Sequence, residues 1–287
     1  MLTREQIASY QTNGYLVVEN VISDEMVAQA RAVIEGFIER SRAVTENDAV
    51  FDLEPGHSPD APKLRRLKDP VKQHPIFEEI MRSERILDVV ADLIGPNIRF
   101  QASKLNMKSA EFGSPVEWHQ DIAFYPHTND DLLAVGMALD DCTLENGCML
   151  MIPGSHNGPV LNHHQDGIFV GAIDGERDQI DLSHAVPVLV KAGGMSVHHV
   201  RTLHGSAPNR SDKPRRLLLF QYTAVDAWPL SGVTDLGAFN AQIVRGNPTA
   251  EYRLAPTRVR IPLPQGERAG SIYEIQSVFK KPVFVRR

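Results

Sequence analysis

Cysteine is scarce in this 287-residue sequence, which contains only Cys142 and Cys148. Two cysteines cannot build the disulfide framework of a small secreted domain. The opening Met-Leu-Thr-Arg-Glu-Gln lacks the apolar core of a secretory signal, and no apolar run approaches the roughly 20 residues that span a bilayer. We therefore expect a chain without a membrane span in the reducing cytoplasm.

Positive charge is also in short supply, because 30 Lys and Arg residues stand against 36 Asp and Glu residues, a formal net charge of -6. A nucleic-acid partner requires a basic surface that neutralises phosphates, so we expect none. A hydrophobic content of 42% is typical of a globular protein with a sizeable core. The expected partner is a small-molecule substrate, and the sequence leaves the oligomeric state open.

The first third of the chain, residues 1–96, is predicted to be mostly helical support. Thr3 and Gln6 have capping-box spacing at the start of a first helix, and Ser23 is placed to cap a second. The sequence also predicts a short strand over residues 15–18, an irregular loop rich in Pro, Asp and other charged residues over 43–70, and a third helix over 75–93.

From residue 97 onward the pattern changes to short runs of β-type residues separated by Gly, Pro, Asn and Asp. The best strand candidates are residues 99–108, 134–140, 148–152, 185–190, 194–199 and 217–224. Strands do not alternate with helices here, which argues against Rossmann and TIM-barrel folds. The pattern predicts a single domain over 1–287 with a mainly β core, a sandwich or jelly roll, over 97–260 and a C-terminal extension over 261–287.

A possible metal site begins with Trp118-His119-Gln120-Asp121. His119 and Asp121 are two residues apart, so both side chains point to the same face of an extended segment. His204 is the strongest candidate for a third ligand. Two histidines and one carboxylate form the facial triad of non-haem Fe(II) oxygenases, which leaves positions open for a co-substrate and O₂.

Arg215 adds a second chemical function eleven residues after His204. If His204 ends one barrel strand and residues 209–214 turn the chain, Arg215 returns toward the metal on the neighbouring strand. A guanidinium there can bind a carboxylate through two parallel hydrogen bonds, which suits the distal carboxylate of 2-oxoglutarate.

At these residues the sequence resembles the phytanoyl-CoA dioxygenase family of Fe(II)- and 2-oxoglutarate-dependent oxygenases. The resemblance covers nearly the whole chain, and its separated matches occur in this order: Gly14-Tyr15-Leu16-Val17-Val18, Trp118-His119-Gln120-Asp121, Glu145-Asn146-Gly147-Cys148, Ile152-Pro153-Gly154-Ser155-His156, His204-Gly205-Ser206 and Arg215. It implies a double-stranded β-helix, the jelly-roll fold of the cupins, with N-terminal helices against one sheet.

The resemblance also implies the roles of individual residues. Iron is expected on His119, Asp121 and His204, and 2-oxoglutarate on Arg215 with Ser206 beside it; Gln120 and Asn106 are expected as lesser cofactor contacts. Neighbours on a strand face opposite ways, so only one of Arg215 and Arg216 can face the barrel interior, and the family spacing favours Arg215. The same question arises for His198 and His199, one of which could line the pocket.

The implied reaction uses Fe(II), 2-oxoglutarate and O₂, releases succinate and CO₂, and hydroxylates an unactivated C–H bond of a small organic molecule. Ascorbate is the expected activator in vitro. Desaturation, epimerisation and ring formation use the same cofactors and stay open, as do a non-catalytic metal- or ligand-binding β-barrel and a cupin-like hydrolase or isomerase that uses another divalent ion.

Overall fold

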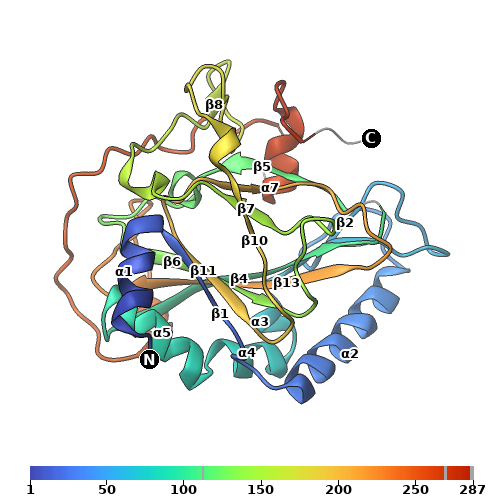
Figure 1. Ribbon diagram of the computed structural model, residues 1–287, viewed down its shortest axis with the longest axis horizontal. Coiled ribbons are helices and arrows are strands. Elements are labelled where there is room, and N and C mark those ends of the chain that lie inside the picture. The colour runs from blue at the N-terminus through green and yellow to red at the C-terminus, as the bar shows by residue number, and fades with distance from the viewer. Residues whose placement is uncertain (112, 268–269, 285–287) are drawn as a thin grey trace.

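Two antiparallel β-sheets dominate the computed structural model, which describes residues 1–111, 113–267 and 270–284 (Figure 1). The major sheet has the order β1-β11-β6-β13-β4-β3-β2, with β14 also paired to β4, and the minor sheet has the order β10-β7-β12-β5. Residues of both sheets line one shared pocket. The predicted mainly β, cupin-like architecture with flanking helices is confirmed.

The strands of the major sheet are β1 (Tyr15–Val18), β2 (Phe51–Leu53), β3 (Leu64–Lys68), β4 (Ile98–Lys108), β6 (Leu132–Ala138), β11 (Met195–His199), β13 (Arg215–Ala224) and β14 (Ile243–Arg245). Those of the minor sheet are β5 (Val116–His119), β7 (Met149–Met151), β10 (Val186–Val188) and β12 (His204–Ser206), and β8 (His164–Gln165) pairs with β9 (Ile168–Phe169) outside both sheets.

The α-helices are α1 (Arg4–Asn13), α2 (Asp24–Ser41), α3 (Pro70–Gln73), α4 (Pro75–Met81), α5 (Glu84–Ile94), α6 (Leu236–Ala241) and α7 (Ile272–Ile275). As predicted, Thr3 and Gln6 form a capping box on α1, and the Ser23 side chain caps α2. These contacts satisfy amide groups that have no partner within the helix.

The main hydrophobic core lies between the N-terminal helices and the outer face of the major sheet. Leu218, Phe220 and Tyr222 of β13 point into this core, whereas the alternate residues Leu217 and Leu219 point to the pocket. This alternation follows from the two-residue period of a strand. The helices therefore hold the outer face of the sheet whose inner face forms one wall of the pocket.

Two expectations for the N-terminal third are wrong. Residues 43–70 are not simply an irregular loop, because β2 and β3 form there and join the major sheet next to β4. The helix predicted over 75–93 is two helices, α4 and α5, separated at Arg82 and Ser83. With β1, three strands of the sheet thus precede residue 97.

None of the described helices is both long enough and apolar enough to cross a membrane.

Candidate active site

The three predicted metal ligands lie together at one end of the minor sheet. His119 is the last residue of β5, His204 is the first residue of β12, and the two are direct antiparallel partners. Asp121 follows in a 3-10 turn over Asp121–Ala123. One ligand atom from each side chain lies within 4.8 Å of the others, and all three residues are buried.

Hydrogen bonds orient the two imidazoles. His119 Nδ1 donates to the Glu117 carbonyl oxygen at 2.8 Å, and His204 Nδ1 donates to the Thr202 carbonyl oxygen at 2.9 Å. A carbonyl only accepts hydrogen bonds, so each Nδ1 carries the proton and each Nε2 keeps a lone pair. Burial lowers the pKa of His204 well below its ordinary value, which keeps that ring neutral and able to bind a metal.

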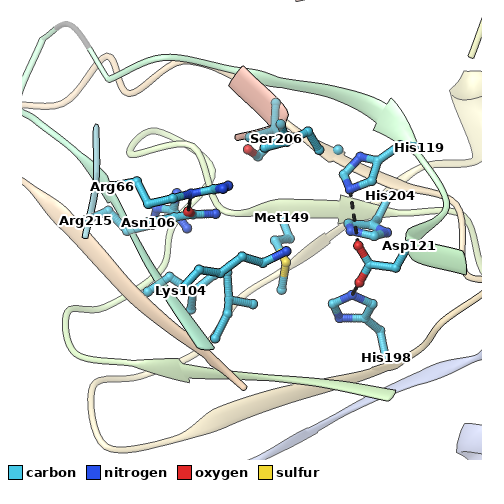
Figure 2. A pocket seen from close by; sticks show the side chains of 15 residues that line it. Arg66, Lys104, Asn106, His119, Asp121, Met149, His198, His204, Ser206 and Arg215 are labelled. Carbon is cyan, nitrogen blue, oxygen red and sulfur yellow. Dashed lines mark hydrogen bonds and ion pairs between the residues drawn. The ribbon is translucent and has the colours of Figure 1, made fainter. Parts of the chain in front are cut away.

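Asp121 is held as a carboxylate. Burial alone would raise its pKa, but the Lys104 cation, with the His119 and His198 rings close by, holds the pKa of Asp121 well below its ordinary value. The His119 Nε2 atom lies 3.6 Å from one carboxylate oxygen, and the His198 Nε2 atom lies 3.4 Å from the other (Figure 2). An ionised oxygen ligand is therefore available beside the two imidazoles.

This donor set fits Fe(II). Two imidazoles and one carboxylate on one side of a common centre are the ligands that non-haem Fe(II) oxygenases use, with the other side open to the pocket. His119, Asp121 and His204 would hold the ion.

Arg215 faces the same pocket from the opposite sheet. It is the first residue of β13, its side chain is 2% exposed, and its Nε has no hydrogen-bond partner among the described residues. Arg216 points the other way and forms ion pairs with Asp140 and Glu35. A buried guanidinium nitrogen without a partner is costly unless a ligand satisfies it, so this end of the pocket fits a carboxylate.

The route by which Arg215 reaches the site differs from the prediction. His204 begins β12 and does not end a strand, and β12 pairs with β5 and β7 in the minor sheet. Arg215 lies on β13 between β4 and β6 in the major sheet. The segment between them crosses from one sheet to the other, so Arg215 reaches the pocket from the facing wall and not from the neighbouring strand.

Ser206 and Asn106 also line the pocket, whereas Gln120 does not. The Ser206 hydroxyl accepts a hydrogen bond from Lys108 at 2.9 Å. The Gln120 amide group donates to the carbonyl oxygens of Pro159 and Arg201, and its oxygen accepts from the Leu161 amide. These three bonds occupy the Gln120 side chain outside the pocket, where it fixes a loop, and the expected cofactor contact has no support in the structure.

Arg66 is a pocket residue that the sequence reasoning missed. It comes from β3, pairs across the strands with Asn106, and its Nε donates to the Asn106 Oδ1 at 2.9 Å (Figure 2). Its Nη2 is buried without a partner among the described residues. The pocket thus holds a second buried guanidinium beside Arg215.

The remaining walls are apolar: Val116, Met149, Leu217, Leu219 and Ile272. Ile272 belongs to α7, so the predicted C-terminal extension supplies part of the pocket lining. The Tyr273 ring beside it stacks against the Arg65 and Arg66 guanidinium groups, at 4.6 and 5.1 Å from the ring centroid. Such walls reduce access of water to the metal ligands.

Comparison with known proteins agrees with this geometry. Residues 10–217 match the family Phytanoyl-CoA dioxygenase (PhyH). The chain belongs to the PhyH family. Members of this family are Fe(II)- and 2-oxoglutarate-dependent oxygenases, and the cofactors of this PhyH chain are accordingly Fe(II), 2-oxoglutarate and O₂.

One relative matches this PhyH chain almost from end to end. It is the "Probable alpha-ketoglutarate-dependent hypophosphite dioxygenase" of Stutzerimonas stutzeri, 36% identical over 276 residues that cover 95% of this chain and 96% of the relative. Its name agrees with the dioxygenase class that the family match gives to this chain.

Two solved structures show the same fold. EvdO2 from Micromonospora carbonacea var. aurantiaca, complexed with 2-oxoglutarate, has a TM-score of 0.61 and 25% identity over 82% of this chain and 94% of its own. The 2-oxoglutarate-dependent carbocyclase SnoK from nogalamycin biosynthesis has a TM-score of 0.62 and 24% identity, and the match covers 86% of this chain and 93% of SnoK.

Proposed function

We propose that this PhyH-family chain hydroxylates a small molecule bound beside the iron. The observation that carries the proposal is the placement of His119, Asp121 and His204 on one side of a pocket that also contains the unsatisfied Arg215 guanidinium. A hydrolase or isomerase has no need for a carboxylate clamp facing its metal. The overall reaction converts R–H, 2-oxoglutarate and O₂ into R–OH, succinate and CO₂.

The chain's own residues divide the work. His119, Asp121 and His204 hold Fe(II), and Arg215 binds the distal carboxylate of 2-oxoglutarate with the Ser206 hydroxyl beside it. Arg66 and Asn106, joined by their hydrogen bond, contact the body of the co-substrate. When bound, iron and 2-oxoglutarate together supply the oxidant that inserts one oxygen atom of O₂ into the substrate. The apolar walls keep water from competing with the substrate.

The finer reaction type does not follow from the fold. The carbocyclase SnoK shares this fold and the same co-substrate, so ring formation and the related desaturation and epimerisation reactions are alternatives for this pocket. We favour hydroxylation of a C–H bond of a small organic molecule as the usual outcome. The mass of the product separates the reactions, since only hydroxylation adds one oxygen atom.

A second candidate substrate is hypophosphite, favoured by the end-to-end match to the Stutzerimonas stutzeri protein. Here one oxygen atom of O₂ enters a P–H bond and the other enters succinate, so hypophosphite, 2-oxoglutarate and O₂ yield phosphite, succinate and CO₂. The reaction stays a hydroxylation and needs no further cofactor.

Because Cys142 and Cys148 are buried free thiols, we place the protein in the reducing cytoplasm.

The test is succinate formation by anaerobically purified protein that is then given Fe(II), 2-oxoglutarate, ascorbate and O₂ with a panel of substrates that includes hypophosphite. We expect turnover that depends on the metal and is lost in His119→Ala. Arg215→Ala should keep Fe(II) and lose 2-oxoglutarate binding in calorimetry. If the wild-type protein neither binds 2-oxoglutarate nor forms succinate, the chain is a non-catalytic binding protein and the proposal is wrong.

A further inference from the structure

Lys104 is a cation in the pocket whose charge the proposed cofactors do not use. It lies in the middle of β4 and lines the pocket, with its side chain directed toward Asp121 and Met149 (Figure 2). Within the described ranges its ammonium group makes no hydrogen bond and no ion pair. An ammonium group in such surroundings is an available donor for a ligand.

The charges around the pocket do not balance. Apart from histidines, the charged residues that line it are the cations Arg66, Lys104 and Arg215 and the carboxylate Asp121. Fe(II) and 2-oxoglutarate carry equal and opposite charges, so loading both leaves this excess of positive charge unchanged. Because buried charges without partners are unfavourable, the loaded pocket favours one more negatively charged ligand.

The strand register separates Lys104 from the end of the pocket that binds the distal carboxylate. Arg215 pairs with Lys108, Arg66 pairs with Asn106, and Lys104 pairs with Leu219. Lys104 therefore lies four residues along β4 from the Arg215 row, roughly 13 Å at the rise of an extended strand. Because the Lys104 side chain is directed toward Asp121, away from Arg215 (Figure 2), we assign the distal carboxylate to Arg215 and not to Lys104.

On the metal side, Lys104 is close enough to Asp121 for the two charges to interact. His198 contacts the same carboxylate. It lies in one cross-strand row with Ala134 and Gln221, next to the row that contains Lys104 and Leu219. The space in front of Lys104 thus borders the open side of the metal cluster. A ligand held there lies beside the reacting centre.

We propose that Lys104 binds an anionic group of the substrate and so selects small oxyanions, either carboxylates or phosphorus oxyanions. The proposal rests on the function proposed above and adds the substrate class and the residue that selects it. Lys104 holds the oxyanion on the metal side of the pocket while Arg215 holds the co-substrate at the other end. The two cations thereby bind two different ligands.

The experiment is anaerobic calorimetry on the full chain loaded with Fe(II) and 2-oxoglutarate. The probes are hypophosphite, methylphosphonate and acetate, with acetamide as the uncharged counterpart of acetate. The variants are Lys104→Met, which keeps the length of the side chain without its charge, Lys104→Arg, and the exposed-surface control Lys72→Met. Fe(II) and 2-oxoglutarate affinities are measured separately for each protein.

We expect at least one oxyanion to bind the wild-type protein and acetamide not to bind. Lys104→Met should weaken binding of that oxyanion about 10- to 100-fold, because a charge-assisted hydrogen bond is lost. Lys104→Arg should recover part of this affinity. The 2-oxoglutarate affinity should change less than about threefold, because a desolvated charge contact acts on its own ligand. The separately measured Fe(II) affinity records any effect of the lost charge on Asp121. The preferred probe distinguishes phosphorus oxyanions from carboxylates.

Three results overturn the proposal. Unchanged oxyanion affinity in Lys104→Met removes the residue from the substrate site. A parallel loss of 2-oxoglutarate affinity makes Lys104 a co-substrate contact. Wild-type protein that binds Fe(II) and 2-oxoglutarate but none of the oxyanions has another class of substrate, and the proposed oxygenase function then stands. Failure to bind 2-oxoglutarate at all, by contrast, removes the oxygenase function itself.

Discussion

His119 on β5 and His204 on β12 are direct cross-strand partners, and their ring centroids lie 4.1 Å apart. The distance between two metal ligands is therefore set by the backbone pairing of two short strands. Gly205, next to His204, has no side chain that could push these strands apart. An added Cβ there would lie 3.1 Å from the Val116 carbonyl oxygen and 3.3 Å from the Trp118 Cα.

Gly205→Ala should consequently weaken Fe(II) binding, because rigid backbone atoms must give way and the two imidazoles shift relative to each other. We expect a loss of about tenfold, in the range seen when the support of metal ligands is disturbed. Gly36→Ala is the control, since a Cβ at this position of α2 meets nothing within 4 Å. Metal titration of both variants checks the prediction, and equal Fe(II) affinities would contradict it.

His198 orients the third ligand through its contact with Asp121. His198→Leu removes this contact and should weaken Fe(II) binding about tenfold. His198→Gln keeps a donor group, so its Fe(II) affinity should lie between those of His198→Leu and the wild type. The exposed His184→Leu serves as the matched control. If Leu and Gln at position 198 weaken Fe(II) binding equally, packing and not the polar contact with Asp121 explains the effect.

Arg66 and Arg65 are neighbours on β3 with different surroundings. Both guanidinium groups stack on Tyr273, but Arg66 also lines the pocket and donates to Asn106, whereas Arg65 is not among the lining residues. Arg66→Met should raise the dissociation constant of 2-oxoglutarate about 10- to 100-fold, because a charged donor in a desolvated site is lost. Arg65→Met should leave it within about threefold, since a stacking contact outside the pocket acts mainly on stability. Calorimetry with Fe(II) present measures both, and the reverse order would show that Arg65 is the co-substrate contact.

The sequence predicts the parts of the site that follow from strand period and from recognisable spacing. His119 and Asp121 point the same way as expected for residues two apart, although Asp121 lies in a 3-10 turn and not in a strand. Arg215 faces inward and Arg216 outward. In the core, the apolar alternation of β13 is visible in the sequence because one face packs against helices.

The missed elements are those whose inner face is polar. β3 reads Leu-Arg-Arg-Leu-Lys, and from the sequence alone this pattern predicts a charged loop, since an arginine that faces a pocket gives the same pattern as one that faces solvent. Lys104 and His198 lie on strands that the sequence predicts, and the choice between His198 and His199, which the sequence leaves open, is settled by His198 lining the pocket. The sheet to which a short strand belongs is also not encoded in its own residues, which is why Arg215 was assigned to the wrong neighbour.

Stability should depend on pH through His127. Its Nδ1 donates to the Tyr125 carbonyl oxygen at 2.8 Å, and burial lowers the pKa of His127 to about 4. In the unfolded chain an imidazole titrates near about 6.5, so between these values the unfolded state binds a proton that the folded state does not. The stability associated with neutral His127 is therefore fully present above about pH 6.5 and is lost as the pH falls through about 4.

Urea unfolding of the wild-type protein and of His127→Asn between pH 7 and pH 4 measures how the free energy of unfolding changes with pH. Wild-type stability should fall by up to about 3 kcal/mol over this range from this residue alone, at 1.36 kcal/mol for each pKa unit. The Asn side chain can still donate to Tyr125 but cannot be protonated, so the variant should lose less stability on acidification. Parallel pH curves for the two proteins would show that His127 is protonated in the folded state, and that acid destabilisation arises from other buried groups.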